Sequence, residues 1–259
     1  MTRPDRSDAR PPEPPHAGSH AVELRTSGSD GRLLITCDHA SPDLHEPWRW
    51  HADDRWLSGT HWAYDLGAAD ITRALAAHLG CPAVLARFSR LLIDPNRALH
   101  SDTLFRYRAE GRRICLNRAL TKGDRDHRTN RWYLPYHNAI DRLTHETPAA
   151  SLLSIHTFTP NYEGEKRSLE AGVLFTEHEA RAREFTAVLR SHGYHTGLNE
   201  PYSGRDGLMY GIERHAIAHG RAALEIEVRQ DIASDPRRRR TMVDALADAT
   251  RRTLLAASP

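Results

Sequence analysis

Three apolar stretches of the sequence end in side chains that can bind a metal ion or transfer a proton. Asp38 and His39 follow LLITC, Asp94 ends RLLID, and His156 ends SLLSIH. In open sheets of parallel strands, ligands bind at the carboxyl ends of the strands. If the three stretches are strands of one sheet, these side chains are expected to meet at one edge of it.

His39 and His156 are the candidate nitrogen ligands of a metal ion. Each histidine alone could simply end a strand and cap a loop. Two of them at the ends of two strands, joined by a carboxylate, supply the ligand set of a catalytic zinc ion with one position left open for water. The spacing does not follow the HExxH pattern. The residues therefore leave three candidates for the carboxylate: Asp38, Asp43 and Asp65.

The stretch RAALEIEVR (221–229) carries charges on a predicted buried strand. Period-two alternation places Glu225, Glu227 and Arg229 on one face and apolar side chains on the other. Burying an unpaired charge costs several kcal/mol. These three side chains are therefore expected to be paired with other charges or to lie beside a metal ion.

Several arginines offer binding groups for a small anion. The segment DPNR is ordinary turn chemistry, but Arg97, with Asn96, could also hold a substrate carboxylate through two parallel hydrogen bonds. Arg90 lies a few residues earlier in FSRLLIDPNR. The glycine-rich stretch YSGRDGLMYGIERH (202–215), which contains Ser203 and Arg205, is predicted to be a substrate-lining loop.

Cys37 is the alternative reactive group of the first stretch. A cysteine-nucleophile hydrolase is the weaker hypothesis, because a cysteine inside an apolar strand usually packs as a small hydrophobic residue. With only three cysteines and no paired spacing, no disulfide framework is expected, and a reducing, cytoplasmic location is predicted.

The elements that must position these residues alternate between strands and helices. Strands are predicted at 32–37, 82–88, 90–94, 151–156, 171–176 and 221–229. Helices are predicted at 63–80, 129–146 (with Asn130 as its cap and Pro148 as its stop), 177–194 and 238–257. Near-continuous apolar strands with intervening helices indicate an α/β protein of three layers, in which helices cover both faces of a mixed, mostly parallel sheet.

Composition limits the classes of partner. The 36 basic and 34 acidic residues give a net charge of +2, which argues against a nucleic-acid-binding protein. No apolar run approaches the roughly 20 residues that span a bilayer, so no membrane partner is expected. Residues 1–30 are proline-rich and lack the apolar core of a signal peptide, which predicts a disordered leader followed by a single domain over 31–259.

Several dispersed motifs resemble those of the N-formylglutamate amidohydrolase family. TCDHAS resembles its CEHAS-type opening, SRLLIDPNR its SRLxxDxNR, SIHTFTP its SxHSFTP, and NEPYSGRDG and LEIEVRQD its closing signatures. The motifs occur in the family's order over about residues 32–232. Ordered motifs are much more specific than any single one, so the sequence is identified as a member of this family.

The resemblance implies a fold similar to that of the zinc carboxypeptidases, succinylglutamate desuccinylase and aspartoacylase (phosphorylase/hydrolase-like). It also implies roles for individual residues. His39 and His156 would match the first and last zinc-binding histidines, and DPNR would match the carboxylate clamp DxNR. EVRQD resembles the carboxypeptidase stretch ELRD, which would make Glu227 the general base or acid.

The sequence departs from those enzymes at one ligand position. They supply a glutamate three residues after the first histidine, where this chain has Pro42. The carboxylate ligand must therefore come from elsewhere, and Asp65 is ranked above Asp38. Asp38, with Asp94 and Glu225, is expected to support the ligands or to serve as a reserve ligand.

The expected activity is metal-dependent hydrolysis of an N-acyl amide, with N-formyl-L-glutamate or a close N-acyl amino acid as the small anionic substrate. The cofactor would be Zn²⁺ or another divalent metal. Arg90 or Arg229 would bind a second carboxylate or stabilise the oxyanion. Two alternatives stay open: a deacylase or peptidase acting on another N-acyl amino acid or modified peptide, and a non-catalytic binding protein that retained the pocket.

Overall fold

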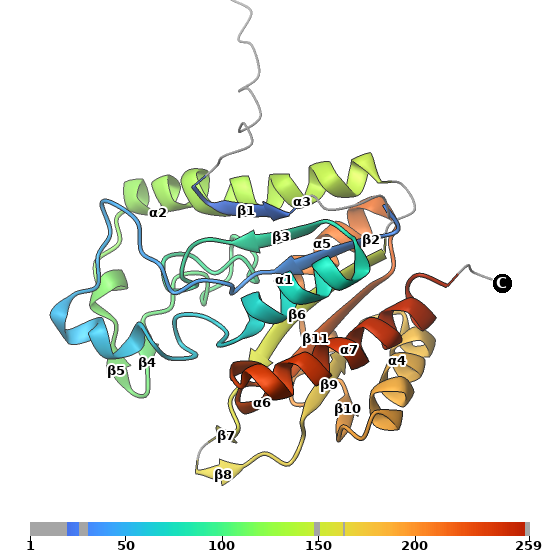
Figure 1. The fold of residues 1–259 in the computed structure, drawn as a ribbon. Helices are drawn as coiled ribbons and strands as arrows, with labels where there is room; N and C mark the ends of the chain where they lie inside the picture. Colours follow the sequence, from blue (N-terminus) through green and yellow to red (C-terminus); the bar gives the residue numbers. More distant parts are fainter. Residues whose placement is uncertain (1–19, 26–30, 148–150, 163, 257–259) are drawn as a thin grey trace, which may run out of the picture.

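A seven-stranded mixed sheet forms the centre of the computed structural model, which describes residues 20–25, 31–147, 151–162 and 164–256 (Figure 1). Across the sheet the strands are β1 (Val22–Arg25), β3 (Ala83–Ala86), β2 (Leu33–Cys37), β6 (Ser151–Phe158), β11 (Ala223–Arg229), β9 (Ala171–Leu174) and β10 (Thr196–Leu198). Strands β3, β2, β6 and β11 are parallel. Strand β1 runs antiparallel to its neighbour β3, and β9 runs antiparallel to its neighbour β11. Strand β10 is parallel to β9.

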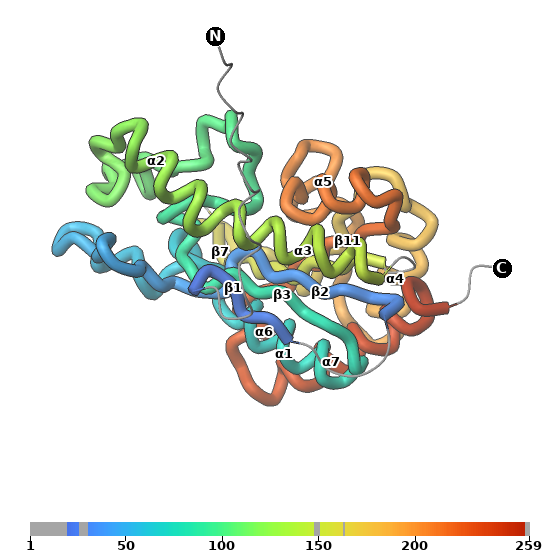
Figure 2. Tube along the Cα trace, turned by 90° about the horizontal axis from the view of Figure 1, so that it is seen from above, coloured from blue at the N-terminus to red at the C-terminus, as the bar shows by residue number. Residues whose placement is uncertain are grey.

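Helices cover both faces of the sheet (Figures 1 and 2). One face packs against α1 (Ala68–Leu79), α4 (Glu179–Ser191), α6 (Gln230–Ser234) and α7 (Pro236–Thr253). The other packs against α3 (Leu134–Glu146) and α5 (Tyr210–His219). Side chains of β2 alternate between the two cores, with Leu33 and Ile35 in the first and Leu34 in the second. The predicted three-layer α/β fold class is therefore confirmed.

Local chemistry fixes the ends of the helices that matter for the site. Helix α1 follows Gly67, whose φ of 82° suits glycine, and ends at Gly80 in the left-handed conformation. Helix α7 begins with Pro236 at its first position. The side chain of Asp235 caps it by accepting hydrogen bonds from the N–H groups of Arg237 and Arg238.

The shorter elements gather around the edge of the sheet at which β2, β3 and β6 end (Figure 1). They are η1 (Ala52–Leu57), the pair β4 (Arg108–Ala109) and β5 (Arg112–Arg113), η2 (Cys115–Asn117), α2 (Lys122–Arg128), η3 (Thr129–Tyr133), and the pair β7 (Asn161–Tyr162) and β8 (Glu165–Lys166). The exception is η4 (Gly204–Asp206), which lies beside the start of α4, where Arg205 pairs with Glu179.

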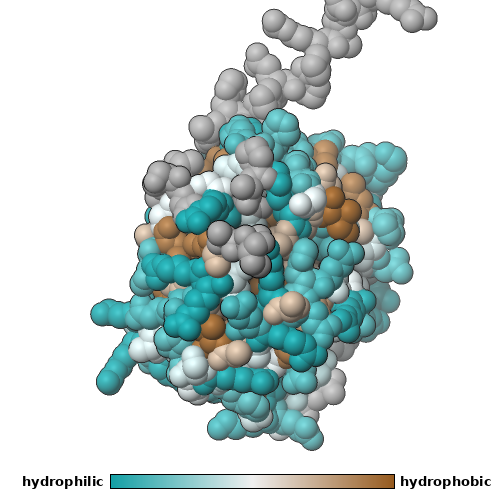
Figure 3. Space-filling model, turned by 90° about the vertical axis from the view of Figure 1, so that its right-hand side faces the viewer, coloured by the Kyte–Doolittle hydropathy of each residue, from teal (hydrophilic) through white to brown (hydrophobic). Residues whose placement is uncertain are grey.

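The face of the molecule shown in Figure 3 is mostly hydrophilic, with hydrophobic side chains in small, separate groups. This is the surface expected when amphipathic helices turn their apolar sides toward a sheet. No helix among the described residues is both long and apolar enough to cross a bilayer.

Most predicted elements are present, but the strand predicted at 90–94 is wrong. Leu91, Leu92 and Ile93 are buried, yet Leu91 and Leu92 lie in a turn and Ile93 has no regular secondary structure. The N–H of Arg90 donates to the Ala63 carbonyl, and that of Leu92 donates to Ser89, so the backbone pairs with loops instead of a strand. A short buried apolar run does not by itself distinguish a strand from such a loop.

The helix predicted at 129–146 begins earlier than expected. Helical structure runs without a break from Lys122 through the π-helical turn η3 to Glu146. Asn130 therefore lies inside it, and the cap is Thr121, which forms a capping box with Asp124. The polar segment KGDRDHR has no apolar periodicity that could have revealed this extension. The predicted stop, Pro148, lies outside the described residues.

Two other expectations are corrected. The stretch 202–215 is not a loop throughout, because helix α5 begins at Tyr210. Residues 22–25, within the predicted leader, form the edge strand β1, and the Arg73 guanidinium of α1 donates to Glu23 at 2.7 and 3.0 Å. Residues 1–19 and 26–30 of that leader, which is predicted to be disordered, lie outside the described part of the chain.

Gly172 of β9 has no room for a side chain. A Cβ atom there would lie 1.9 Å from the backbone oxygen of Glu200. We expect Gly172→Ala to destabilise the protein by about 1–3 kcal/mol, because backbone must move to admit the methyl group. Gly123→Ala is the matched control: its Cβ meets nothing closer than 3.7 Å in α2, and alanine is the better helix former by up to about 1 kcal/mol. Urea denaturation measures both changes, and equal stability of Gly172→Ala and wild type would contradict the first.

Candidate active site

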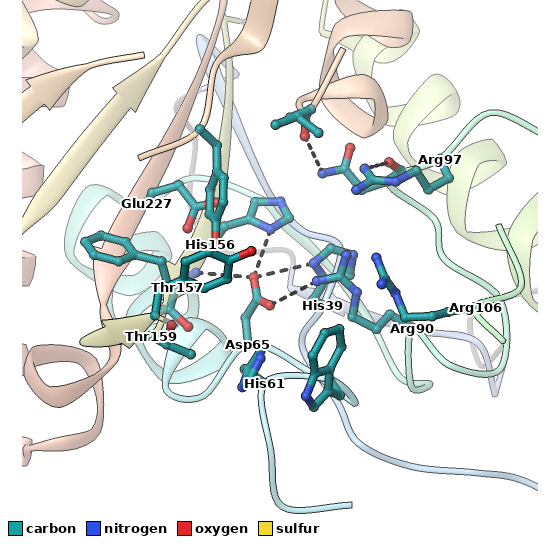
Figure 4. A pocket seen from close by; sticks show the side chains of 16 residues that line it. His39, His61, Asp65, Arg90, Arg97, Arg106, His156, Thr157, Thr159 and Glu227 are labelled. Atoms are coloured by element: carbon teal, nitrogen blue, oxygen red, sulfur yellow. Dashed lines mark hydrogen bonds and ion pairs between the residues drawn. The ribbon is translucent and has the colours of Figure 1, made fainter. Parts of the chain in front are cut away.

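A cavity of about 280 Å³ opens at the carboxyl ends of the central parallel strands (Figure 4). Its floor comes from the end of β2, from β6 and from β11, which contribute His39, His156 and Glu227. Its walls come from loops around Asp65, Arg97 and the segment 202–208. As predicted, side chains from the carboxyl ends of these strands lie close together in the structure.

Asp65 lies between His39 and His156. Its Oδ2 atom is 2.9 Å from Nδ1 of His156 and 3.4 Å from Nδ1 of His39. The N–H of Asp65 donates to the His39 carbonyl at 2.9 Å, and the Thr157 N–H donates to Oδ2 at 3.2 Å. These backbone contacts hold the loop before α1 against the strand ends, so all three side chains are buried and converge on one point.

The three residues fit a divalent metal. Their ligand atoms all lie within 4.8 Å of one another. Nδ1 of His39 is buried and makes no hydrogen bond within the described residues, although it points at the carboxylate. Two imidazole nitrogens and one carboxylate oxygen form the donor set typical of a catalytic zinc ion.

The other two carboxylate candidates lie elsewhere. Asp43 is exposed at the surface. Asp38 is buried on the far side of His156 from Asp65, where its Oδ1 accepts a hydrogen bond from the Tyr136 hydroxyl and its Oδ2 is 3.7 Å from His156 Nε2. The geometry thus brings Asp65, and not Asp38, between the two histidines.

Carboxylates also face the outer nitrogens of both histidines. Asp94 Oδ1 is 2.8 Å from His39 Nε2, and Glu225 Oε2 is 3.5 Å from His156 Nε2. Burial acts to raise the pKa of Asp94, but the Arg90 guanidinium and His39 hold it well below its usual range. Partners of this kind fix the orientation of metal-binding histidines and raise their basicity.

Glu227 reaches the cavity beside His156, its register partner in the β6–β11 pair. Its Oε2 atom is buried and has no hydrogen-bond partner within the described residues. Burial raises the pKa of Glu227 well above its ordinary value; His156 opposes this, and Asp65 and Glu225 add to it. A carboxyl group with a raised pKa beside a candidate metal site is a candidate for taking up and returning a proton.

Three arginines, Arg90, Arg97 and Arg106, line the opposite side of the cavity (Figure 4). Arg90 donates to Asp94 at 2.8 and 3.1 Å and lies 3.6 Å from Asp65. Arg97 donates to Thr103 and to the Asn96 carbonyl, contacts that hold its side chain without neutralising its charge. The cavity therefore presents positive charge to a ligand on the side facing Glu227.

Comparison with known proteins decides the family. A sequence profile described as N-formylglutamate amidohydrolase matches residues 31–233. The chain belongs to the N-formylglutamate amidohydrolase family. Members of this family are hydrolases that act on amide bonds, and so is this chain. A search of curated proteins found no match.

Two solved structures are similar to this member of the N-formylglutamate amidohydrolase family. A gene product of Agrobacterium tumefaciens is 27% identical, with a TM-score of 0.85 over 91% of this chain and 95% of that one. An N-formylglutamate amidohydrolase of Ralstonia eutropha JMP134 is 17% identical, with a TM-score of 0.64 over 92% of this chain and all of that one. The second likeness shows that the fold is shared.

Three predicted site residues are not brought to the cavity of this amidohydrolase. The guanidinium of Arg229 donates to the carbonyls of Arg167, Ser168 and Leu169 and to Asp231, so it fastens the loop before β9. Arg205 pairs with Glu179 of α4 at the surface, and Ser203 is not among the lining residues. From their stretch, Tyr202 and Leu208 line the cavity instead.

Asn96 lies at the cavity, but its side chain is occupied. Its Nδ2 donates to the Leu208 carbonyl at 2.9 Å, and its Oδ1 accepts from the Gly211 N–H at 2.7 Å. Asn96 thus ties the DPNR turn to the start of α5. Cys37 packs in the apolar core, and burial raises the pKa of its thiol to about 12, which makes it unsuitable as a nucleophile.

A buried chain of polar groups supports the same turn from α3 and α5, and no sequence pattern indicates it. His137 Nε2 is 3.1 Å from the Pro95 carbonyl, His137 Nδ1 is 2.9 Å from His215 Nε2, and His215 Nδ1 is 2.6 Å from Asp141. A carbonyl only accepts, so His137 donates through Nε2 and accepts from His215 through Nδ1. These contacts hold Pro95, the residue that follows Asp94 in the DPNR turn, in place.

Four further residues line the cavity that no motif indicated: His61, Trp62, Arg106 and Tyr162. They come from loops with no regular period and from the β7–β8 pair. The only local signal was composition, because the segments around them are rich in aromatic and basic residues.

Proposed function

We propose that this chain is a metal-dependent amidohydrolase that removes a short acyl group from an N-acyl amino acid, with N-formyl-L-glutamate as its substrate. The observation that carries the proposal is the convergence of His39, Asp65 and His156 beside Glu227, in a cavity whose opposite side is lined by arginines. A related structure of the same fold is an N-formylglutamate amidohydrolase, which supports the choice of substrate.

His39 and His156, through Nδ1, and Asp65, through Oδ2, would hold the metal ion. When bound, a zinc ion supplies Lewis acidity, which polarises the acyl oxygen and lowers the pKa of a coordinated water. Asp94 and Glu225 keep the two imidazole rings turned toward that position through their outer nitrogens.

Glu227 moves the proton. It accepts one from the attacking water as the new C–O bond forms, and it donates that proton to the amine nitrogen as the C–N bond breaks. The products are a carboxylic acid, formate for a formyl substrate, and the free amino acid. The raised pKa of Glu227 suits both halves of this transfer.

Arg97 orients the substrate. Its guanidinium has no acidic partner within the described residues, and it would pair with the substrate α-carboxylate through two hydrogen bonds. Arg90 already pairs with Asp94, so its role is a different one. It balances the charge of the buried carboxylates and faces the acyl oxygen of the substrate.

The test is hydrolysis by the full chain after metal removal and replacement. We expect the chelated protein to lose activity, and one equivalent of Zn²⁺ to restore hydrolysis of N-formyl-L-glutamate in preference to N-acetyl- and N-succinyl-L-glutamate. Release of free glutamate measures all three reactions. Preference for another acyl group would move the assignment to a different deacylase, and a metal-loaded protein that hydrolyses none of them would overturn it.

A further inference from the structure

The three cavity arginines differ in how their charge is balanced. Arg90 forms ion pairs with Asp94 and Asp65. Arg97 and Arg106 form no ion pair within the described residues, and no described residue accepts a hydrogen bond from the Arg106 guanidinium. One substrate carboxylate on Arg97 therefore leaves a second cavity cation without a counter-charge.

Arg106 is held in position although its guanidinium donates to no residue of the described part of the chain. It lies 5.2 Å from the centroid of the Trp62 ring, a cation–π contact. Trp62 in turn donates from Nε1 to Glu110 at 3.2 Å. The backbone oxygen of Arg106 accepts from Asn117 Nδ2 at 2.9 Å, and Asn117 is itself bound by Arg128. The guanidinium is thus presented to the cavity on a fixed backbone and a fixed aromatic face.

The surroundings of Arg106 favour an anion. Burial lowers its pKa, and the like charges of Arg90 and Arg97 add to the effect, with Asp94 opposing. A partly buried cation beside two other cations gains most from a ligand that brings a negative charge. The donors of a guanidinium match a carboxylate in geometry as well as charge.

We propose that Arg106, stacked on Trp62, binds a second carboxylate of the substrate and thereby selects N-acyl derivatives of acidic amino acids. This inference rests on the proposed function, which assigns the α-carboxylate to Arg97. It replaces Arg90 and Arg229, the residues that the sequence suggested for the second carboxylate, because Arg90 is neutralised and Arg229 lies outside the cavity.

The test compares two substrates that differ only in one charge. N-formyl-L-glutamine has nearly the shape of N-formyl-L-glutamate and lacks its side-chain carboxylate. We expect Arg106→Gln to lower kcat/KM for the glutamate derivative roughly 10- to 100-fold, the range for loss of a charged hydrogen bond. The loss for the glutamine derivative should be at least about tenfold smaller. Arg106→Lys, which keeps the charge without the planar fork, should recover part of the difference.

Arg112→Gln is the matched control. Arg112 makes the same kind of contact, 5.0 Å from the centroid of the Trp56 ring, but it is exposed and does not line the cavity. This variant should leave the ratio of the two kcat/KM values as in wild type. Equal losses for both substrates in Arg106→Gln, or no loss for either, would overturn the inference while leaving the proposed function intact.

A binding measurement separates the two proposals if neither amide is hydrolysed. Calorimetry of the zinc-loaded protein with glutarate and with butyrate, which carries one carboxylate fewer, reports the second anion site directly. Tighter binding of glutarate that Arg106→Gln abolishes would support the site even for a chain with another reaction. No preference for glutarate in the wild type would refute it.

Discussion

Replacing Glu227 by glutamine is expected to lower kcat by at least about 100-fold, the lower end of what a positioned general base contributes. The change keeps the size of the side chain and removes only its ability to take a proton. Because Glu227 is not one of the three residues proposed to hold the metal, His39, Asp65 and His156, the metal content of the variant should equal that of the wild type. Turnover at saturating substrate, metal analysis and the thermal midpoint measure the three properties.

Glu225→Gln is the matched control for this experiment. Glu225 lies on the same face of β11, two residues earlier, but it faces His156 Nε2 and does not line the cavity. We expect it to weaken metal binding roughly 10- to 100-fold and, at saturating metal, to retain more turnover than Glu227→Gln. Near-wild-type turnover of Glu227→Gln with full metal content would show that the proton acceptor is another group.

Replacing Asp65 by asparagine is expected to weaken zinc binding by more than about 100-fold, beyond the range found for residues that only support a ligand. The amide cannot supply the negative charge that Oδ2 places between Nδ1 of His39 and Nδ1 of His156. Competition with a chromophoric chelator measures the zinc affinity, and activity should fall in proportion to zinc occupancy.

Asp38→Asn introduces the same chemical change on the other side of His156. Its carbonyl oxygen can still accept from the Tyr136 hydroxyl, so we expect at most a roughly 10- to 100-fold loss of zinc affinity. The opposite order, with Asp38→Asn the more damaging, would make Asp38 the carboxylate ligand and remove Asp65 from that role.

The parts of the site that the sequence could predict are those set by strands. His39, His156 and Glu227 stand at or near the ends of apolar stretches, and parallel pairing carries such ends to one edge of the sheet. Asp65 is harder to predict, because it is placed by contacts between a loop and two strand ends: its N–H donates to the His39 carbonyl, and the Thr157 N–H donates to its side chain. A contact of that kind depends on the path of a loop, which no local pattern records.

The arginines show most clearly which parts of the site cannot be predicted from the sequence. Arg229 shares the face of Glu227, yet its long side chain reaches past the cavity to three carbonyl groups of the loop before β9. Arg106 stands in a segment with several other arginines, and its place on the cavity wall distinguishes it from Arg112, which makes the same kind of contact with a tryptophan ring. Charge and spacing identify a group of candidate arginines, whereas the choice among them depends on which carbonyls and rings lie within reach.

The direction of β9 has a consequence for how substrate range can change in evolution. Because β9 runs antiparallel to β11, the chain that leaves the end of β6 at Phe158 and enters β9 at Ala171 starts and finishes at the same edge of the sheet. This return segment carries β7 and β8 (Figure 1). Its residues Thr159 and Tyr162 line the cavity. Insertions or deletions there would reshape the wall while every strand pair of the seven-stranded sheet stays as it is. The segment between β6 and β9 can therefore change in length and sequence without changing the residues proposed to hold the metal and move the proton.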